Sequence, residues 1–228
     1  MKSDMKRMLA DIEMEVAYTR SLIGKSKLDP RVMAAIGKVS REAFVPSDLK
    51  PFAYDNGPLP IGNGQTISQP YIVALMTDLL QPEPDHIVLE VGTGSGYQAA
   101  VLSQLVKKVF TIERIPALGD AAAVHLRSLG YSNIEYRIGN GYDGWPEHAP
   151  YDAIIVTAAA SHIPPALMAQ LKTGGRLVIP VGLPDMPQEL MLLEKDDQGR
   201  IYTRNIIGVA FVPLQDEDNA SGNNGMSR

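Results

Sequence analysis

HIVLEVGTGSGYQAAVLSQLV (86–106) is the stretch that decides the fold of this chain. Residues 86–91 form a short apolar run that leads into glycines, which is typical of a buried parallel strand. Residues 97–106 have the pattern of a helix. Glycines between a strand and a helix allow a tight turn and let a ligand approach the main chain. The N-terminus of the helix then presents a partial positive charge to that ligand.

Strands and helices continue to alternate after this stretch. Short apolar runs predict further strands, and runs with helical spacing predict helices. The expected strands are 109–113, 134–139, 151–158 and 175–182, with two final strands in 189–195 and 202–214, and the expected helices are 117–130, closed by Gly130, and 164–171. Repeated strand–helix units predict an α/β fold with a doubly wound, mostly parallel, Rossmann-like sheet covered on both faces.

The N-terminal part has a different pattern. Apolar residues at helical spacing predict an amphipathic helix over 2–22, and Asp29-Pro30 marks the start of a second helix over 30–39. The proline- and glycine-rich segment 46–70 predicts a long ordered loop, which we interpret as a substrate loop, before a helix over 70–80.

These patterns predict one domain over residues 1–214. It divides into an N-terminal helical and loop extension (1–80) and a ligand-binding core (81–214). The polar tail, 215–228, is expected to be disordered.

Composition excludes several classes of function. The formal net charge is −5, and the scattered basic residues argue against a nucleic-acid partner. The chain has no cysteine, and its four dispersed histidines lack ligand spacing, so no metal is expected. No apolar run reaches the roughly 20 residues that span a bilayer, and the N-terminus does not resemble a secretory signal. We therefore expect a cytoplasmic protein without a membrane partner.

The glycine turn has the spacing E-x-G-x-G-x-G, from Glu90 to Gly96. A dinucleotide-binding G-x-G-x-x-G motif would need glycine at position 97, where this chain has Tyr97. The spacing instead resembles the motif of class I S-adenosylmethionine-dependent methyltransferases. The alternative is a tight turn that binds no ligand.

Two polar residues follow the next strands. Glu113 ends the second strand of the core, where in this fold its carboxylate can accept hydrogen bonds from both ribose hydroxyls. The alternative is a solvated acid at a helix start. Asn140, between Gly139 and Gly141, is placed to face an adenine ring, although Asn-Gly is also a strong turn dipeptide.

Several segments together resemble the protein-L-isoaspartate O-methyltransferase family, and the likeness runs from about residue 28 to 214. The most specific is LPIGNGQTISQPYIVALM (59–76), and the others are VLEVGTGSGYQAAVLS (88–103), APYDAIIVTAA (149–159), LKTGGRLVIPVG (171–182) and GVAFVPL (208–214). The resemblance implies a seven-stranded, usually monomeric enzyme with S-adenosylmethionine as cofactor. It implies methylation of the free carboxylate of L-isoaspartyl residues, and more weakly of D-aspartyl residues, in damaged proteins. The ester then collapses through a succinimide, which begins repair.

The resemblance also implies site residues. Ser68 would lie at the active site as the catalytic residue, and the substrate-binding residues would be Ile61, Ser68 and Val212. The full candidate set for the cofactor is Gln65, Thr66, Ile67, Ser68, Glu90, Gly92, Thr93, Gly94, Gly96, Glu113, Arg114, Asn140 and Gly141. This chain departs from the family in having Asn140 where an aspartate is usual, and a small Ala210 before F-V-P-L.

The chemistry needs few groups. A carboxylate is ionised at neutral pH, so it requires no general base to attack a methyl sulfonium. Proximity and alignment then supply most of the acceleration. We expect the Ser68 hydroxyl to hold one carboxylate oxygen, although Ser68 is also a candidate cap for a helix starting near Tyr71.

Three other functions remain open from the sequence. The chain has the features of a relative that methylates an aspartate in a modified peptide, and equally of a catalytically silent cofactor-binding relative. A nucleotide-dependent oxidoreductase is disfavoured by the glycine spacing.

Overall fold

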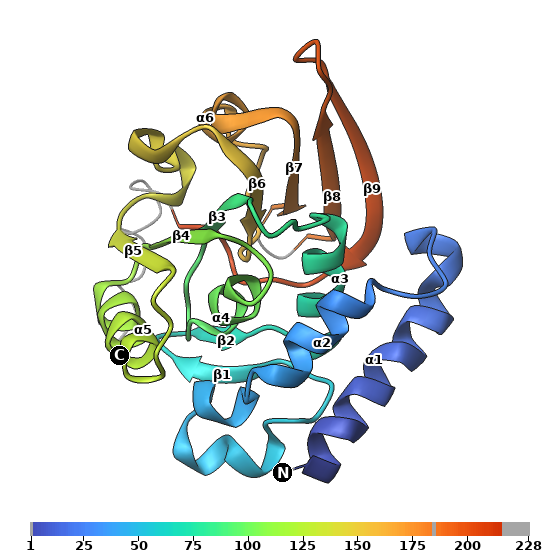
Figure 1. Ribbon diagram of the computed structural model, residues 1–228, viewed down its shortest axis with the longest axis vertical. Coiled ribbons are helices and arrows are strands. Elements are labelled where there is room, and N and C mark those ends of the chain that lie inside the picture. Colours follow the sequence, from blue (N-terminus) through green and yellow to red (C-terminus); the bar gives the residue numbers. More distant parts are fainter. Residues whose placement is uncertain (1, 184–185, 216–228) are drawn as a thin grey trace, which may run out of the picture.

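The computed structural model describes residues 2–183 and 186–215, so most of the predicted disordered tail, 215–228, lies outside the described residues. The centre of the molecule is a seven-stranded sheet with the strand order β5-β4-β3-β6-β7-β8-β9 (Figure 1). The strands are β3 (Ile87–Val91), β4 (Lys108–Glu113), β5 (Ile134–Ile138), β6 (Tyr151–Val156), β7 (Leu171–Val181), β8 (Gln188–Lys195) and β9 (Ile201–Val209). Within this sheet, β8 is antiparallel to its two neighbours, β7 and β9, and all other neighbouring strands are parallel. The predicted fold class is confirmed.

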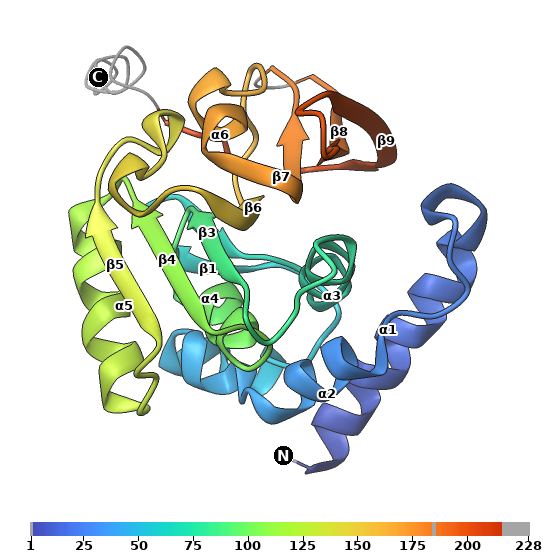
Figure 2. The same ribbon diagram turned by 45° about the horizontal axis from the view of Figure 1, so that its top comes forward.

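Helices cover both faces of this sheet. Figure 2 shows α4 (Tyr97–Ser103) and α5 (Pro116–Ser128) on one side and α6 (Pro165–Gln170) on the other. Each face has its own apolar core, one built on α3 (Pro70–Leu79) and α4, the other including Leu167 of α6. Both faces of β3, β4 and β6 are buried, which explains why these strands read as unbroken apolar runs.

The N-terminal extension packs onto the first of these cores. It consists of α1 (Lys2–Ile23), α2 (Pro30–Lys38), two short 3-10 helices (Arg41–Phe44 and Ser47–Phe52) and a hairpin of β1 (Leu59–Gly62) and β2 (Gln65–Ile67). Met8 and Ile12 of α1 belong to the same buried cluster as Val178 and Leu190 of the sheet. The predicted substrate loop, 46–70, is therefore ordered and contains the hairpin.

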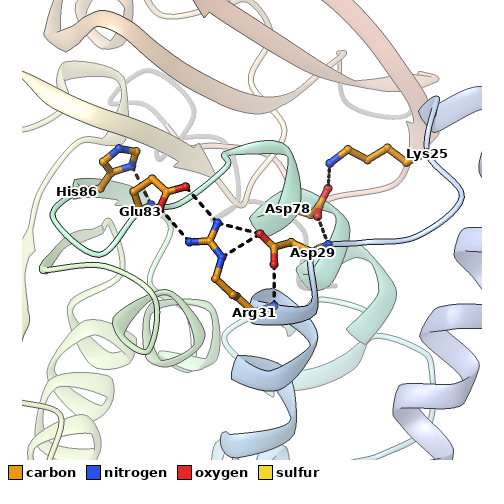
Figure 3. A network of polar contacts seen from close by, with 6 residues as sticks. All are labelled: Lys25, Asp29, Arg31, Asp78, Glu83 and His86. Atoms are coloured by element: carbon orange, nitrogen blue, oxygen red, sulfur yellow. Dashed lines mark hydrogen bonds and ion pairs between the residues drawn. The ribbon is translucent and has the colours of Figure 1, made fainter.

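A polar network ties α2 to α3 and to the start of the core (Figure 3). Asp29 caps α2 by accepting from the Arg31 backbone N–H at 2.7 Å, and its own N–H donates to Asp78 at 2.6 Å. Asp78 is buried and also pairs with Lys25. Arg31 bridges Asp29 and Glu83. The network fixes α3, whose first residue, Pro70, is the last residue of the predicted substrate loop.

Three element ends differ from the predictions by three residues or more. The helix expected over 97–106 ends at Ser103, whose hydroxyl donates to the Ala100 carbonyl at 2.7 Å and so competes with the helical bonds. β7 begins at Leu171 rather than at 175, because an irregularity in its pairing with β6 lets residues 171–174 join the strand.

The last strand is also shorter than expected. β9 ends at Val209, and residues 210–214 leave the ladder. The side-chain amide of Gln188 pairs with both backbone groups of Phe211, at 2.6 and 3.0 Å, in place of a strand partner. Pro213 then has no N–H to offer a ladder. Among the described residues, no helix has the length and apolar character needed to cross a bilayer.

Candidate active site

The sheet has a topological switch point between β3 and β6. The chain moves outward from β3 to β4 and β5, then returns to β6 and moves the other way. Ligands in such folds bind outside the carboxyl ends of the strands at this point. A cavity of about 760 Å³, partly open to solvent, lies there. Its lining includes the turn after β3, the ends of β4 and β6, and the β2 segment.

The glycine turn forms one wall of this cavity with its backbone. Gly92 has φ +98°, a conformation that L side chains rarely adopt. A Cβ at Gly92 would lie 2.4 Å from the hydroxyl oxygen of Thr157, which donates to the Gly92 carbonyl at 2.6 Å. The close approach of these two residues, just after β3 and β6, requires glycine at position 92.

Glu113 closes the cavity at the end of β4. Its side chain is almost completely buried, and its two carboxylate oxygens accept from the backbone N–H groups of Gly94 (2.8 Å) and Ile115 (2.9 Å). The alternative interpretation of Glu113 as a solvated acid at a helix start is wrong, because the side chain is buried. Each oxygen has a further lone pair for a ligand hydroxyl, since a carboxylate offers about four acceptor sites.

Glu90 supports the turn from behind and does not line the cavity. Its side chain is fully buried in β3, and one oxygen accepts from the Thr111 hydroxyl at 2.5 Å. The Thr111 hydroxyl lies 2.6 Å from that of Thr93, which does line the cavity. Burial raises the pKa of Glu90 to about 8, and the nearby Glu113 raises it further while the Thr111 hydrogen bond opposes the shift. A chain of hydroxyls therefore joins a buried carboxyl group to the cavity wall.

Arg41 anchors the predicted substrate loop. Its buried guanidinium donates to the carbonyls of Ala53 (2.8 Å) and Gly57 (3.2 Å) and lies 5.2 Å from the ring centroid of Tyr97. Burial lowers its pKa to about 10, so it stays charged at neutral pH. Because Tyr97 is the first residue of α4 and lines the cavity, Arg41 holds the loop in a fixed position relative to the glycine turn.

Ser68 is not the cap of the following helix. The helix α3 begins at Pro70 with Gln69 as its N-cap residue, and the side chain of Asn56 accepts from the Tyr71 N–H at 3.2 Å. The interpretation of Ser68 as a helix cap is therefore wrong. Its side chain lines the cavity instead.

A second cavity, a groove of about 1160 Å³ that is also partly open to solvent, adjoins the first. Both are lined by Thr66, Ser68, Thr157 and Val212, so the two spaces meet at these residues. The groove continues between α3 and the segment that follows β9. A ligand in each space would bring two reacting groups together beside Ser68.

The structure places most of the predicted site residues on the first cavity. They are Gln65, Thr66, Ile67, Ser68, Gly92, Thr93, Gly94, Glu113, Arg114, Gly141 and Val212. Four others lie outside its lining. Glu90 lies behind the turn, and a Cβ added at Gly96 would stand 3.1 Å from the side chain of Leu126 of α5.

The remaining two stand close to the lining residues. Ile61 reaches within 3.4 Å of where a Gly94 Cβ would stand. The side-chain oxygen of Asn140 accepts from the Tyr142 N–H at 3.1 Å, which gives Asn140 the turn role considered from its sequence.

Sequence reasoning missed several cavity residues, of which Thr157 is the most informative because it lines both spaces. The sequence feature that could have identified Thr157 is its position at the carboxyl end of the strand beside the switch point. Within the described residues, no three side chains of the metal-binding types gather in one place.

This chain is similar to known proteins over most of its length. Residues 18–219 match the family model described as protein-L-isoaspartate(D-aspartate) O-methyltransferase. A protein-L-isoaspartate O-methyltransferase 2 from Polaromonas sp. is 63% identical over 91% of this chain and 98% of its own length. A relative of the same name from Syntrophobacter fumaroxidans is 59% identical over 91% of this chain and 84% of its own length.

Two solved structures share the fold. One, titled protein-L-isoaspartate O-methyltransferase, has a TM-score of 0.81 at 26% identity over 93% of this chain, which spans 66% of that solved chain. The other, a putative enzyme of the same name from Plasmodium falciparum in complex with S-adenosyl-L-homocysteine, has a TM-score of 0.72 at 25% identity over 90% and 97%.

Proposed function

Since this chain belongs to the protein-L-isoaspartate(D-aspartate) O-methyltransferase family, we propose that it methylates the free carboxylate of L-isoaspartyl residues in damaged proteins and so starts their repair. The observation that carries the proposal is the meeting of the two cavities at Thr66, Ser68, Thr157 and Val212. One space is suited to the methyl donor and the other to an extended peptide.

The first cavity suits S-adenosylmethionine, which supplies an electrophilic methyl group when bound. Its wall at Gly92 and Gly94 is bare backbone that lets a ligand approach closely. Glu113 would hold the ribose, and Gln65 to Ser68 would cover the reacting end. Gly141 and Asn140 would border the adenine.

The chain needs to position the acceptor rather than activate it. An isoaspartyl carboxylate has an unperturbed pKa near 4, so it is an anion at neutral pH. Ser68 would donate a hydrogen bond to one carboxylate oxygen and leave the other oxygen to attack. Val212 and Thr157 would shape the space around the acceptor.

The decisive test is methyl incorporation into an isoaspartyl peptide, with the matched aspartyl peptide as control. Labelling of the isoaspartyl peptide alone is the expected result. Labelling of the aspartyl peptide would favour a carboxyl methyltransferase of another specificity. Cofactor binding without any labelling would identify a silent relative.

Replacing Ser68 with alanine is expected to lower turnover roughly 10- to 100-fold, because a hydrogen bond to a charged group contributes about 1.5–3 kcal/mol. Affinity for S-adenosylhomocysteine should change less, since many other groups line the first cavity. Steady-state kinetics and calorimetry separate the two effects. Ser128→Ala, on the exposed side of α5, is the control. Equal losses of turnover and affinity would count against a positioning role.

Replacing Asn140 with aspartate is expected to preserve or strengthen binding of S-adenosylhomocysteine. A carboxylate keeps the acceptor for the Tyr142 N–H and offers a stronger acceptor to an adenine amino group. Calorimetric titration measures the affinity, and Asn205→Asp on exposed β9 controls for the added charge. If the Asn140 variant binds more weakly than wild type, the carbonyl of Asn140 is not an adenine contact.

The proposal also covers the domain organisation, the absence of a nucleic-acid partner, the location and the oligomeric state of the protein. We propose a single domain over 1–214, since residues of α1 and of the sheet share one buried cluster. The net charge of −5 supports a protein that binds no nucleic acid. We propose a cytoplasmic monomer, and sedimentation at micromolar concentration tests the oligomeric state.

A further inference from the structure

The groove next to the first cavity carries an unbalanced charge. Its lining is mostly apolar or neutral, and Glu189 is the single charged residue among the described residues that form it. Glu189 is exposed at the start of β8 and forms no ion pair with any other residue in the described part of the chain. Its carboxylate therefore contributes an uncompensated negative charge within a side-chain length of the groove.

The neighbouring polar groups do not neutralise this charge. The amide of Gln188 is already bonded to both backbone groups of Phe211 and is almost fully buried. Thr66, Ser68 and Thr157 lie at the other end of the groove, where it meets the first cavity. Glu189 therefore acts on whatever occupies the outer part of the groove.

The sheet register and the chain length limit the distance between Glu189 and the reacting end. Glu189 is paired with Gly208, and the groove wall runs from Gly208 to Val212. Because β9 ends at Val209, these four steps of chain cover at most roughly 13 Å. A peptide lying in the groove with its acceptor beside Val212 would place a residue two to four positions away near Glu189.

We propose that Glu189 is a specificity-determining residue that favours isoaspartyl substrates with lysine or arginine two to four residues from the damaged site and disfavours those with aspartate or glutamate there. This inference rests on the proposed function. The charge is exposed, so each charged contact is expected to change kcat/KM by only about two- to fivefold. Because the interaction is screened, high salt will weaken it.

The experiment compares isoaspartyl peptides of equal length that carry lysine, glutamine or glutamate at one of four positions on either side of the isoaspartyl residue. The kcat/KM of the lysine peptide is divided by that of the glutamate peptide, and this ratio is measured at about 0.02 M and at about 0.5 M salt. At the higher concentration the Debye length falls to a few ångströms, so the charge of Glu189 is screened. At the responsive position, a ratio of about fivefold is expected at low salt for the wild type. Glu189→Gln should bring the ratio close to one.

A matched variant separates local from overall charge. Glu13→Gln changes the net charge equally but lies exposed on α1, outside both cavities, and should keep the wild-type ratio. A ratio near one in the wild type, or a ratio that survives Glu189→Gln, overturns the inference while isoaspartyl methylation stands. Failure of the wild type to label any isoaspartyl peptide overturns the proposed function itself.

Discussion

Replacing Gly92 with alanine is expected to lower the affinity for S-adenosylhomocysteine by at least about 100-fold. The added Cβ would stand 2.4 Å from the Thr157 hydroxyl oxygen, and the backbone at φ +98° is unfavourable for alanine. The turn or the Thr157 side chain has to move, and both form the wall of the first cavity. Calorimetry measures the affinity, and thermal unfolding measures the accompanying loss of stability.

Two further variants separate backbone strain from steric collision. Gly199 lies in the turn between β8 and β9, has φ +78°, and has no atom within 4 Å of where a Cβ would be added. Gly199→Ala therefore introduces backbone strain without a steric collision and should leave cofactor binding unchanged. Adding Thr157→Ala to Gly92→Ala removes the colliding oxygen and should recover part of the affinity. Wild-type affinity in Gly92→Ala would show that the turn does not contact the ligand.

Local sequence determines most of the core of this fold. The strands β3, β4 and β6 could be located because residues buried on both faces leave unbroken apolar runs. The glycine turn could be predicted because its spacing reflects backbone geometry within one short segment. The alternation of strands and helices predicted a doubly wound, mostly parallel sheet, whereas the order of its strands became known only from the structure.

Contacts between distant segments could not be predicted. Thr157 meets Gly92 across 65 positions of sequence, and no local pattern marks that pairing. The apolar run 202–214 has the pattern of one strand, but only its first part pairs with β8. The side chain of Gln188 then bonds Phe211, and Pro213 forms a single parallel bridge with Ala159. The acidic residue of the glycine motif was assigned to the ligand, whereas Glu90 supports the turn through Thr111.

Glu90 is expected to make the stability of this protein fall as pH rises. Its folded pKa of about 8 lies above its ordinary value of 4.5, because burial disfavours the charged carboxylate. The folded state then binds the proton more tightly than the unfolded state between these two values. The resulting stabilisation is complete below pH 4.5 and is lost as the pH approaches 8. One pKa unit corresponds to about 1.4 kcal/mol, so the loss should be about 3–5 kcal/mol.

Glu90→Gln removes this titration and keeps an acceptor oxygen for the Thr111 hydroxyl. Urea unfolding from pH 5 to pH 9 should therefore show a shallower pH dependence in the variant, with the variant more stable than wild type at pH 8 and above. Subtracting the two curves isolates Glu90 from the other carboxyl groups, whose contributions are common to both proteins. The exposed Glu13→Gln should follow the wild-type curve. Parallel curves for wild type and Glu90→Gln would mean that Glu90 is ionised in the folded protein. The hydroxyl chain from Thr111 to Thr93 would then end in a buried negative charge beside the first cavity.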